Sequence, residues 1–555
     1  MSSSTDTNAG PTPAPRARKS AVPKVAAAVV IVVLVIGAGL YVFRSNLTGS
    51  SSTAGKTLII GSTATYASLD PAVAFDTASV LFDDQIYNTL IGYGTTTYNG
   101  TTVGSLTPVP ELATSWVSNA NGSVTFTLRQ GVNFVNPDGS LGPVFNASDV
   151  QFSLDRIITM KQGADFHVFT FLNESGIHVL GPYSVMLVPS RPYPWFLNLF
   201  QLWVTGIVNP AYINAHGGVV AGKVNTFMTN NAMGTGPYLL NSTSTSQIVM
   251  VANPHYWGGA PKISKVIYEI TPSATTQQTE LEGGAINIAL NIPYSQMSSL
   301  ATYKNVQVSS GPTSSEYYIG LDENVTPFNN TLVRQAMEFA TNQTELVKYS
   351  TYGFGIPIQS VIAKSIESYT PAFKNYSFNP AKARALLQQA GYGHGFTTTF
   401  YYTSGDPVGA AIFTILQQEL NNVGVNITGT PLQSGTFNDE AGHGTFPMFF
   451  EGWVNLLATP EDGLFPLFYN GNLGIYGNYN YYNNSTASHL LLTAGETLNA
   501  TQRDSMYAQV QNMLGQAAVE IPLFNLQNVI PHTTNVHDLY VYPTFDMYFD
   551  QAYMT

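Results

Sequence analysis

The sequence predicts an α/β protein that is divided into more than one lobe. Three observations support this fold class. The chain has 555 residues, 44% of them are hydrophobic, and short β-like runs are mixed with helix-like stretches without a periodic repeat. A chain of this length is too long for one hydrophobic core, so two or three lobes are expected. The lack of a repeat indicates discontinuous lobes rather than a solenoid or a coiled coil.

Strands are predicted mainly in the first half of the chain. Short apolar runs, punctuated by Gly, Pro and Asn, occur at residues 57–61, 123–129 and 183–189. Such runs are typical of half-buried or buried strands.

Helices are predicted where apolar residues recur every three or four positions. In residues 149–160, with Ser148 as the expected N-cap, the apolar positions fall on one face. This face comprises Val150, Leu154, Ile157 and Ile158. Further helices are expected at residues 331–340, 379–390 and 500–514.

The first 56 residues are predicted to form a separate unit. Residues 1–24 are basic and rich in Pro, Ser and Thr, residues 25–43 carry no charge, and residues 44–56 resemble a flexible linker. The uncharged run is long enough to cross a bilayer, and the Lys and Arg residues before it predict a cytoplasmic N-terminus. We expect an uncleaved single-pass anchor with the rest of the chain extracellular; a cleaved secretion signal is the alternative.

The charge and cysteine contents exclude several classes of function. Only 10% of the residues are charged, and the absence of cysteine excludes disulfides, thiolate metal sites and a catalytic cysteine. From residue 57 onward, 15 Lys and Arg stand against 32 Asp and Glu, a net charge of −17. Nucleic acid is therefore not expected as a partner.

Two surface properties follow from the same composition. Fourteen Asn-x-Ser/Thr sequons indicate an exported, glycosylated surface. Sparse charge limits self-repulsion when carboxylates are protonated, which favours an acidophilic, archaeal host.

Catalysis and metal binding have little support in the sequence. Adjacent acids occur at Asp83-Asp84, Asp439-Glu440 and Glu461-Asp462. Glycoside hydrolysis needs two carboxylates that face each other, so these neighbouring acids are expected to be solvated turn residues. The chain has no G-x-S-x-G elbow and no phosphate-binding loop, and His532 and His537 lack the spacing of a metal pair. We expect no enzyme activity, no metal and no cofactor.

Aromatic residues beside Gly or Asn favour a binding function. They include Tyr93, Trp257, Trp453 and the stretch 471–485, which contains Asn478 and Asn480; Tyr66 stands between Thr65 and Ala67, outside an apolar run. Aromatic faces flanked by amides can stack on neutral polar ligands. The alternative is that a chain rich in Tyr and Asn carries such residues in its loops by chance, and that Trp453 fills the core.

A series of short blocks resembles the solute-binding proteins of peptide/nickel-type ABC importers. In order, the blocks are Leu69-Asp70-Pro71, IYNTL (86–90), PELATSW (110–116), TFTLRQGVNF (125–134), NASDVQFSLDR (146–156), GTGPY (234–238), NPHYW (253–257), LEGGAI (281–286), VRQAM (333–337), FNPAKARALL (378–387), RDSMYAQVQNML (503–514) and Ile521-Pro522-Leu523. Their order and spacing cover nearly all of residues 57–555, so the chain is identified as a member of that family.

The resemblance implies a two-lobed α/β fold of the periplasmic-binding type, with a cleft, a hinge and an extra domain inserted near the N-terminus. Lobe I is expected at 57–93, 205–310 and 515–555, the inserted domain at 94–204, and lobe III at 311–514. The glycines of GTGPY are expected where the chain crosses between lobes. Hinge closure would bury a solute and present it to a membrane permease. The receptor is expected to be a monomer.

The resemblance also bears on the ligand. In peptide-binding members, an acid after the Gly-Trp pair binds the peptide's α-ammonium group, and that position is Leu456 here. Thr65 and Tyr66 carry no charge, and Phe450 stands where a base can serve the peptide carboxylate. Because a buried ammonium without a partner costs several kcal/mol, an oligosaccharide or similar neutral ligand is expected, with a short peptide as the alternative.

The expected ligand-binding residues are Thr65, Tyr66, Phe450, Gly452, Trp453, Leu456, Asn478 and Asn480. Glu451, Glu461 or Asp462 could supply the missing charge for a peptide. A secreted glycosidase and a glycosylated surface-structure protein are the remaining alternatives.

Overall fold

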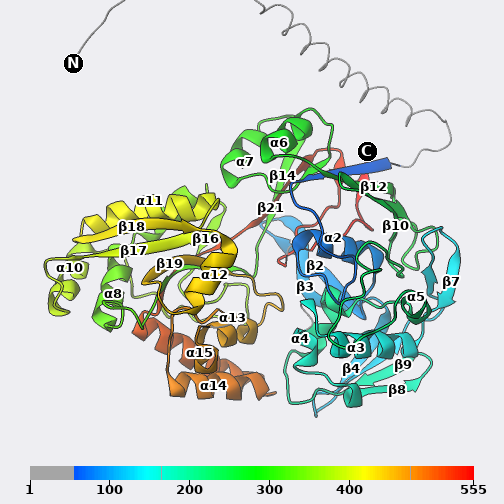
Figure 1. Cartoon of the computed structure of the whole chain (residues 1–555), viewed down its shortest axis with the longest axis horizontal. Helices are drawn as coiled ribbons and strands as arrows, with labels where there is room; N and C mark the ends of the chain where they lie inside the picture. Colours follow the sequence, from blue (N-terminus) through cyan, green and yellow to red (C-terminus); the bar gives the residue numbers. More distant parts are fainter. Residues whose placement is uncertain (1–55, 164–165, 475–476, 545) are drawn as a thin grey trace, which may run out of the picture. The chain divides into compact units, whose positions relative to one another are not determined.

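The computed structural model describes residues 56–163, 166–474, 477–544 and 546–555, which Figure 1 shows in colour. The expected cytoplasmic tail (1–24), membrane anchor (25–43) and all but the last residue of the linker (44–56) therefore lie outside the described residues. Within the described ranges, no helix is long and apolar enough to cross a membrane.

The N-terminal strand lies inside a mixed sheet, which we call the first sheet. Among the described residues its order is β10-β11-β12-β1-β13-β21-β14. These strands are β1 (Lys56–Ser62), β10 (Tyr238–Thr243), β11 (Gln247–Ala252), β12 (Ile263–Ile270), β13 (Ile288–Ala289), β14 (Val306–Gly311) and β21 (Asn528–Thr533). β1 runs parallel to β12 and β13. Leu58 and Ile60 are fully buried on one face, and Ile59 packs against a second cluster on the other, as expected for a central strand covered on both faces.

Helices pack on this sheet through apolar side chains. They are α2 (Thr77–Ile86), α5 (Pro210–Ala215), α6 (Ala274–Glu282) and α7 (Tyr294–Leu300), and a short ribbon of β22 (Val536–His537) and β23 (Tyr553–Met554) lies near the C-terminus. Phe82 of α2 shares a core with Leu58 and Tyr238. α2 begins after Asp76, whose carboxylate accepts a hydrogen bond from the Ser79 amide at 2.9 Å, which is an N-cap.

A second mixed sheet has the order β16-β20-β15-β19-β17-β18 among the described residues. Its strands are β15 (Glu316–Leu321), β16 (Gly355–Pro357), β17 (Phe396–Thr403), β18 (Val425–Leu432), β19 (Met448–Trp453) and β20 (Glu520–Leu526). One face is covered by α8 (Thr331–Ala340), α9 (Gln343–Ser350), α10 (Pro380–Gln389) and α11 (Pro407–Asn421). On the other face Tyr318 and Phe449 pack against Phe437 of α12 (Ser434–Gly442).

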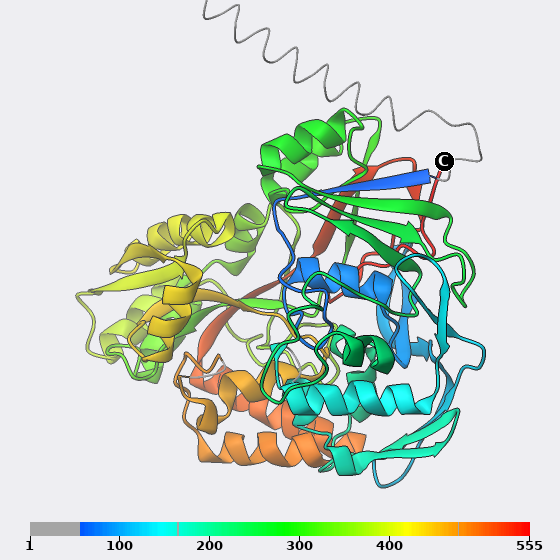
Figure 2. The ribbon, with the colours of Figure 1, turned by 45° about the vertical axis from the view of Figure 1, so that its right-hand side comes forward.

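Three more helices lie between β19 and β20 in the chain. They are α13 (Pro460–Phe468), α14 (Ser485–Glu496) and α15 (Ala500–Ala517), with the 3-10 turn η5 (Asn470–Asn472) between the first two. α14 and α15 pack side by side, as Figure 2 shows.

The segment between α2 and the return to the first sheet forms a region of its own, which we call the inserted region. Its strands are β2 (Ile91–Tyr98), β3 (Thr101–Pro110), β4 (Ala113–Ser118), β5 (Val124–Leu128), β6 (Asn133–Val135), β7 (Leu141–Val144), β8 (Ile177–Gly181) and β9 (Ser184–Leu187). Its helices and turns are α3 (Ala147–Met160), α4 (Phe166–Phe169), η2 (Glu174–Gly176), η3 (Phe196–Gln201) and η4 (Trp203–Thr205). A four-stranded sheet, β4-β5-β9-β8, buries Phe126 and Val185 against Leu154 of α3.

The start of α3 differs from the sequence prediction. The N-cap is Asn146 and not Ser148, because the Asn146 side chain accepts a hydrogen bond from the Ser148 amide at 2.8 Å. The Asp149 carboxylate in turn accepts one from the Asn146 amide at 2.8 Å. This reciprocal pair is a capping box.

Within the described part of the chain, the backbone passes between the first and second sheets in two places: from β14 to β15 through residues 312–315, and from β20 to β21 through Gln527. The GTGPY segment lies at neither of these two crossings; it leads directly into β10, where the chain enters the first sheet after the inserted region. Gly234 instead allows a close approach, because a Cβ there would lie 2.0 Å from the Ile86 carbonyl oxygen. The lobe boundary expected at residue 515 also differs, since β20 pairs with β15 in the second sheet.

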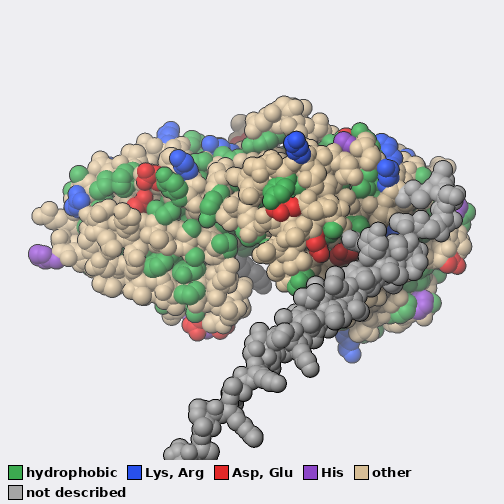
Figure 3. All heavy atoms as spheres, turned by 90° about the horizontal axis from the view of Figure 1, so that it is seen from above, with side chains coloured by type: hydrophobic (Ala, Val, Ile, Leu, Met, Phe, Trp, Pro, Cys, Tyr) green, Lys and Arg blue, Asp and Glu red, His purple; other side chains and the backbone are tan. Residues whose placement is uncertain are grey.

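Charged side chains are sparse and scattered on the face that Figure 3 shows, among many neutral polar atoms. This agrees with the low share of charged residues in the sequence.

Candidate functional site

The loop that joins β19 to α13, residues 453–462, is held in one conformation by its own polar groups. Asn455 donates from Nδ2 to the Thr459 carbonyl oxygen at 2.8 Å and accepts from the Thr459 amide at 3.1 Å. Asp462 accepts from the Leu457 amide at 3.1 Å. Trp453 donates from its indole Nε1 to the Asp462 carbonyl oxygen at 2.8 Å. Buried groups that satisfy one another in this way make a rigid loop. We call it the Trp453 loop.

The Trp453 loop is attached to the segment that crosses between the sheets. Ser314 donates from Oγ to the Asn455 carbonyl oxygen at 2.7 Å, and Asn525 donates from Nδ2 to the Ser315 carbonyl oxygen at 2.8 Å. All four residues are buried. The loop, the crossing segment and β20 therefore form one unit at the place where the chain changes sheets.

Trp453 and Phe450 face opposite sides of the second sheet. Side chains alternate along a strand, so two residues three positions apart in β19 point to different faces. Phe450 is 4% exposed and packs in the core under α8 to α11, which places it away from a ligand on the Trp453 side. The alternation of side chains along the sequence MFFEGW could have predicted that Phe450 and Trp453 lie on opposite faces of the strand.

Gly452 serves the core and does not open space for Trp453. A Cβ at Gly452 would lie 2.4 Å from the ring of Tyr317. Trp453 itself is half-buried, with its ring beside Gly477. Together with the half-buried Leu456 it packs on the large hydrophobic cluster described next.

One hydrophobic cluster joins the inserted region to helices α13, α14 and α15. Polar contacts accompany it. Trp195 donates from Nε1 to Glu367 Oε1 at 2.6 Å, and the Arg503 guanidinium lies 5.0 Å from the Trp195 ring centre. His167 Nε2 is 3.5 Å from Asp462 Oδ1. Of these residues the sequence analysis named only Asp462. Trp195, Glu367, Arg503 and His167 could not be identified from the sequence, because each is an isolated polar or aromatic residue until the fold brings it to its partner.

Thr65 and Tyr66 lie with the first sheet. Thr65 is exposed and Tyr66 is half-buried. The Tyr66 hydroxyl donates to Asn230 Oδ1 at 2.6 Å, and its ring packs edge-on against Phe82 with centres 5.7 Å apart. These contacts lie within the first-sheet part of the molecule and do not join Tyr66 to the Trp453 loop.

Asn478 and Asn480 are buried and bind protein groups. Asn478 donates from Nδ2 to the Tyr469 carbonyl oxygen at 3.0 Å, and Asn480 donates to Glu520 Oε2 at 3.3 Å. Their exposures are 0% and 2%. Both amides hold the loop after α13 in place, which is a structural role.

Several carboxyls near the Trp453 loop are half-buried or buried. Burial raises the pKa of Glu451 and of Glu461 to about 7; for Glu461 the charge of Asp462 also raises the pKa, while Arg191 and His167 lower it. Burial raises the pKa of Glu520 to about 8. Such groups are neutral in acid and titrate near neutral pH.

Two of the three adjacent acid pairs were wrongly expected to be solvated turns. Asp83 and Asp84 lie inside α2 and are 2% and 8% exposed, and Asp462 is 7% exposed in the first turn of α13. Asp439 and Glu440 are exposed, as expected. The buried pairs do not face each other across an open space, so they offer no arrangement for glycoside hydrolysis.

His532 and His537 each bind other residues. His532 Nε2 lies 2.9 Å from Ser309 Oγ, and His537 Nε2 lies 3.1 Å from Thr555 Oγ1. In the part of the chain that the structure describes, no three acids or histidines are grouped as metal ligands would be.

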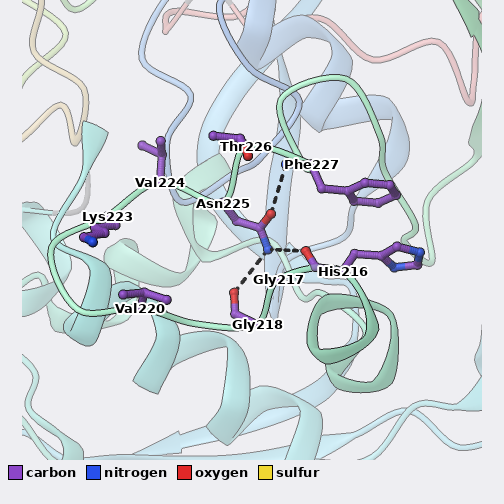
Figure 4. Close-up of a pocket in the computed structure, with 9 residues that line it drawn as sticks. All are labelled: His216, Gly217, Gly218, Val220, Lys223, Val224, Asn225, Thr226 and Phe227. Carbon is purple, nitrogen blue, oxygen red and sulfur yellow. Dashed lines mark hydrogen bonds between the residues drawn. The ribbon is translucent and has the colours of Figure 1, made fainter.

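A cavity of about 320 Å³ lies at the loop after α5 (Figure 4). Asn225 holds this loop by donating to the His216 and Gly218 carbonyl oxygens at 3.0 and 3.1 Å. The His216 ring stacks on Phe227 with centres 4.0 Å apart. The lining contains no expected ligand-binding residue, and the polar side chain at its centre is satisfied within the loop, so we do not assign the solute site to it.

Comparison with known proteins gives consistent results. The family model for bacterial extracellular solute-binding proteins, family 5, matches residues 107–475. The glutathione-binding protein GsiB of Salmonella typhimurium is 27% identical over 520 residues, which cover 92% of this chain and 96% of GsiB.

Solved structures share the fold. HbpA2 of Haemophilus parasuis aligns with a TM-score of 0.78 and 24% identity over 90% of this chain and 100% of its own. The periplasmic binding protein DppA of Helicobacter pylori, in complex with the peptide STSA, aligns with a TM-score of 0.72 and 25% identity over 90% and 98%. The α/β fold of the periplasmic-binding type is confirmed.

Proposed function

Because the chain belongs to the family 5 bacterial extracellular solute-binding proteins, we propose that it captures short peptides between its lobes and delivers them to an ABC importer. It is a binding protein and not an enzyme. The observation that carries the proposal is the family match over residues 107–475, within an alignment that covers most of the chain.

The relatives favour a peptide over the oligosaccharide expected from the sequence. GsiB is named for glutathione, a tripeptide, and the DppA structure contains a peptide. Leu456 is uncharged at the position where the family resemblance expects an acid. A single uncharged position does not exclude peptides if another carboxyl binds the ammonium group. The oligosaccharide is therefore not retained as the main ligand class.

The geometry supports a solute site bounded by the Trp453 loop. Two chain crossings, through residues 312–315 and Gln527, are where a hinge between the sheets would bend. The contacts of Trp195 with Glu367 and of His167 with Asp462 would close over a bound solute. Of the ligand-binding residues expected from the sequence, we retain Trp453 and Leu456 for the proposed site.

The finer parts of the proposal concern location and assembly. We propose that residues 25–43 anchor the receptor beside its permease, which keeps the local concentration of receptor high. The extracellular position, the monomeric state and the glycosylation of the sequons remain predictions. The archaeal source is not supported by the relatives, which are bacterial.

The test is a thermal unfolding screen of residues 56–555, which form a unit of their own. We expect di-, tri- and tetrapeptides, including glutathione, to raise the unfolding midpoint. A ligand at 100 times its Kd adds about 2.7 kcal/mol to the free energy of unfolding. Neutral tri- and tetrasaccharides serve as the comparison. A shift with saccharides alone, or with no compound, would contradict the proposal.

A further inference from the structure

Glu316 is a buried carboxyl without a partner at the point where the chain enters the second sheet. It is the first residue of β15, directly after the crossing segment, and its exposure is 0%. Neither of its carboxylate oxygens accepts a hydrogen bond from another residue among those the structure describes. The hydroxyl of the neighbouring Ser315 is also buried and unpartnered. Buried polar groups are nearly always paired, so this pair of residues requires an explanation.

Glu316 lies beside the Trp453 loop. In the antiparallel pair β15 and β19, Glu316 stands directly opposite Trp453, and directly opposite residues share one face of a sheet. The charge of Asp462, at the end of the loop, acts on Glu316. Glu316 therefore occupies the corner formed by the crossing segment and the loop that bounds the proposed solute site.

The other carboxyls around Trp453 are engaged. Glu451 Oε1 accepts a hydrogen bond from the Gly452 amide at 3.1 Å. Asp462 accepts from the Leu457 amide and pairs with His167. Arg191 and His167 act electrostatically on Glu461. Among these acids, Glu316 is the fully buried one with neither oxygen accepting a hydrogen bond from another described residue.

A peptide brings an ammonium group that loses its water when the lobes close. A buried ammonium needs a carboxylate within hydrogen-bond distance, and Leu456 offers none. We propose that Glu316 receives the ammonium group of the bound peptide. This inference rests on the proposed function and adds the residue that permits a peptide despite Leu456.

Ionisation of Glu316 couples peptide binding to the release of a proton. Burial, followed by the charges of Glu520 and Asp462, raises the pKa of Glu316 well above its ordinary value, which favours the neutral carboxyl when no ligand is bound. An arriving ammonium favours the ionised form. The carboxyl proton then passes to the solvent, and the ammonium and carboxylate form an ion pair.

The test compares a neutral tripeptide that stabilises the protein in the screen, trialanine in the first instance, with its N-acetyl derivative, which has no ammonium group. Calorimetry on residues 56–555 gives the two Kd values. In Glu316→Gln, we expect binding of the free-amine peptide to weaken on the order of 10- to 100-fold, the range of a hydrogen bond to a charged group. Binding of the acetylated peptide should not change.

Glu520→Gln is the matched control. Glu520 is buried on the same strand face, one strand away, and is held by Asn480. Because the charge of Glu520 raises the pKa of Glu316, this variant should bind the free-amine peptide as well as the wild-type protein does or more tightly, and the acetylated peptide equally well. An equal loss of both peptides in Glu316→Gln, or the same selective loss in Glu520→Gln, would overturn the assignment of Glu316.

A measurement on the wild-type protein guards against a variant that fails to fold. Calorimetry at pH 6 in buffers of different ionisation enthalpy should show release of about one proton with trialanine and none with its acetylated form. No difference between the two peptides would reject the role of Glu316 and leave the proposed function intact. Failure of every peptide in the screen would instead reject the proposed function itself.

Discussion

At the scale of single residues, Trp453 and Leu456 bound the proposed site, and Glu316 stands across from Trp453 in the neighbouring strand. Trp453 is half-buried, and its indole N–H donates a hydrogen bond within its own loop. Its ring can therefore form a wall of the proposed site that keeps its orientation without ligand. Leu456 shares the same rigid loop and packs on the cluster that joins the inserted region to α13, α14 and α15.

The uncharged side chain of Leu456 can be replaced by an acid to test its effect on peptide binding. Leu456→Asp places a carboxylate where the family resemblance expects the ammonium partner, so it should tighten binding of free-amine peptides by about tenfold, the value of a modest charged hydrogen bond. It should also restore binding of such peptides to Glu316→Gln. Calorimetry with a free-amine peptide and its acetylated form measures both effects.

Val454→Asp is the control for this change. Val454 belongs to the same loop but is 41% exposed, so the new charge stays in water and should alter neither Kd. Equal effects of the two substitutions would show that net charge alone, and not position 456, controls affinity.

At the scale of elements, local patterns predicted the helices well. The helix expected at 331–340 is α8 with the same bounds, and those expected at 379–390 and 500–514 are α10 and α15 within a few residues. The strands at 57–61, 123–129 and 183–189 are β1, β5 and β9. The GTGPY segment leads directly into β10, and its glycines allow close contact with the backbone of Ile86, which the sequence pattern did not predict.

Gly234 lies against the backbone of Ile86, where a larger residue has no space. A Cβ there would meet the Ile86 carbonyl oxygen, a backbone atom that cannot move aside cheaply. Gly234→Ala should lower the free energy of unfolding by about 1–3 kcal/mol, the usual cost of overpacking. Chemical denaturation of residues 56–555 measures it.

Gly435→Ala is the comparison for Gly234→Ala. Gly435 lies near the start of α12 with no atom within 4 Å of its Cβ position. Alanine there should be neutral or stabilising by up to about 1 kcal/mol. Similar losses in both variants would mean that the approach to Ile86 is not the cause.

At the scale of the whole molecule, buried carboxyls set the response to pH. Burial raises the pKa of Glu111, Glu451, Glu461 and Asp546 to about 7 and that of Glu520 to about 8. In the unfolded chain these groups titrate near pH 4. Between those values the folded protein holds more protons than the unfolded chain.

The sign of the pH dependence follows. Stability falls with pH wherever the folded state binds more protons, so the contribution of these groups is fully present below about pH 4 and is lost as the pH rises to about 8. Urea denaturation of residues 56–555 from pH 4.5 to 8 should show a free energy of unfolding that decreases by several kcal/mol.

Glu520→Gln should flatten the upper part of that profile, since glutamine cannot ionise, whereas Asp439→Asn, at an exposed residue, should leave it unchanged. A free energy of unfolding that increases over this range would contradict the burial of the carboxyls. Tolerance of acid, which the sparse charge of the sequence predicted, is the same expectation reached from the folded state.

The sequence by itself determined the fold class, the bounds of the main helices and the family, because these depend on local periodicity, capping residues and the order of short blocks. Tertiary structure alone decided which residues meet at the site. The pairing of Glu316 with Trp453 joins residues far apart in the chain, and the burial of Asp83 and Asp84 depends on what α2 packs against. Facing partners, burial and the resulting pKa values arise from long-range packing, which local sequence patterns do not encode.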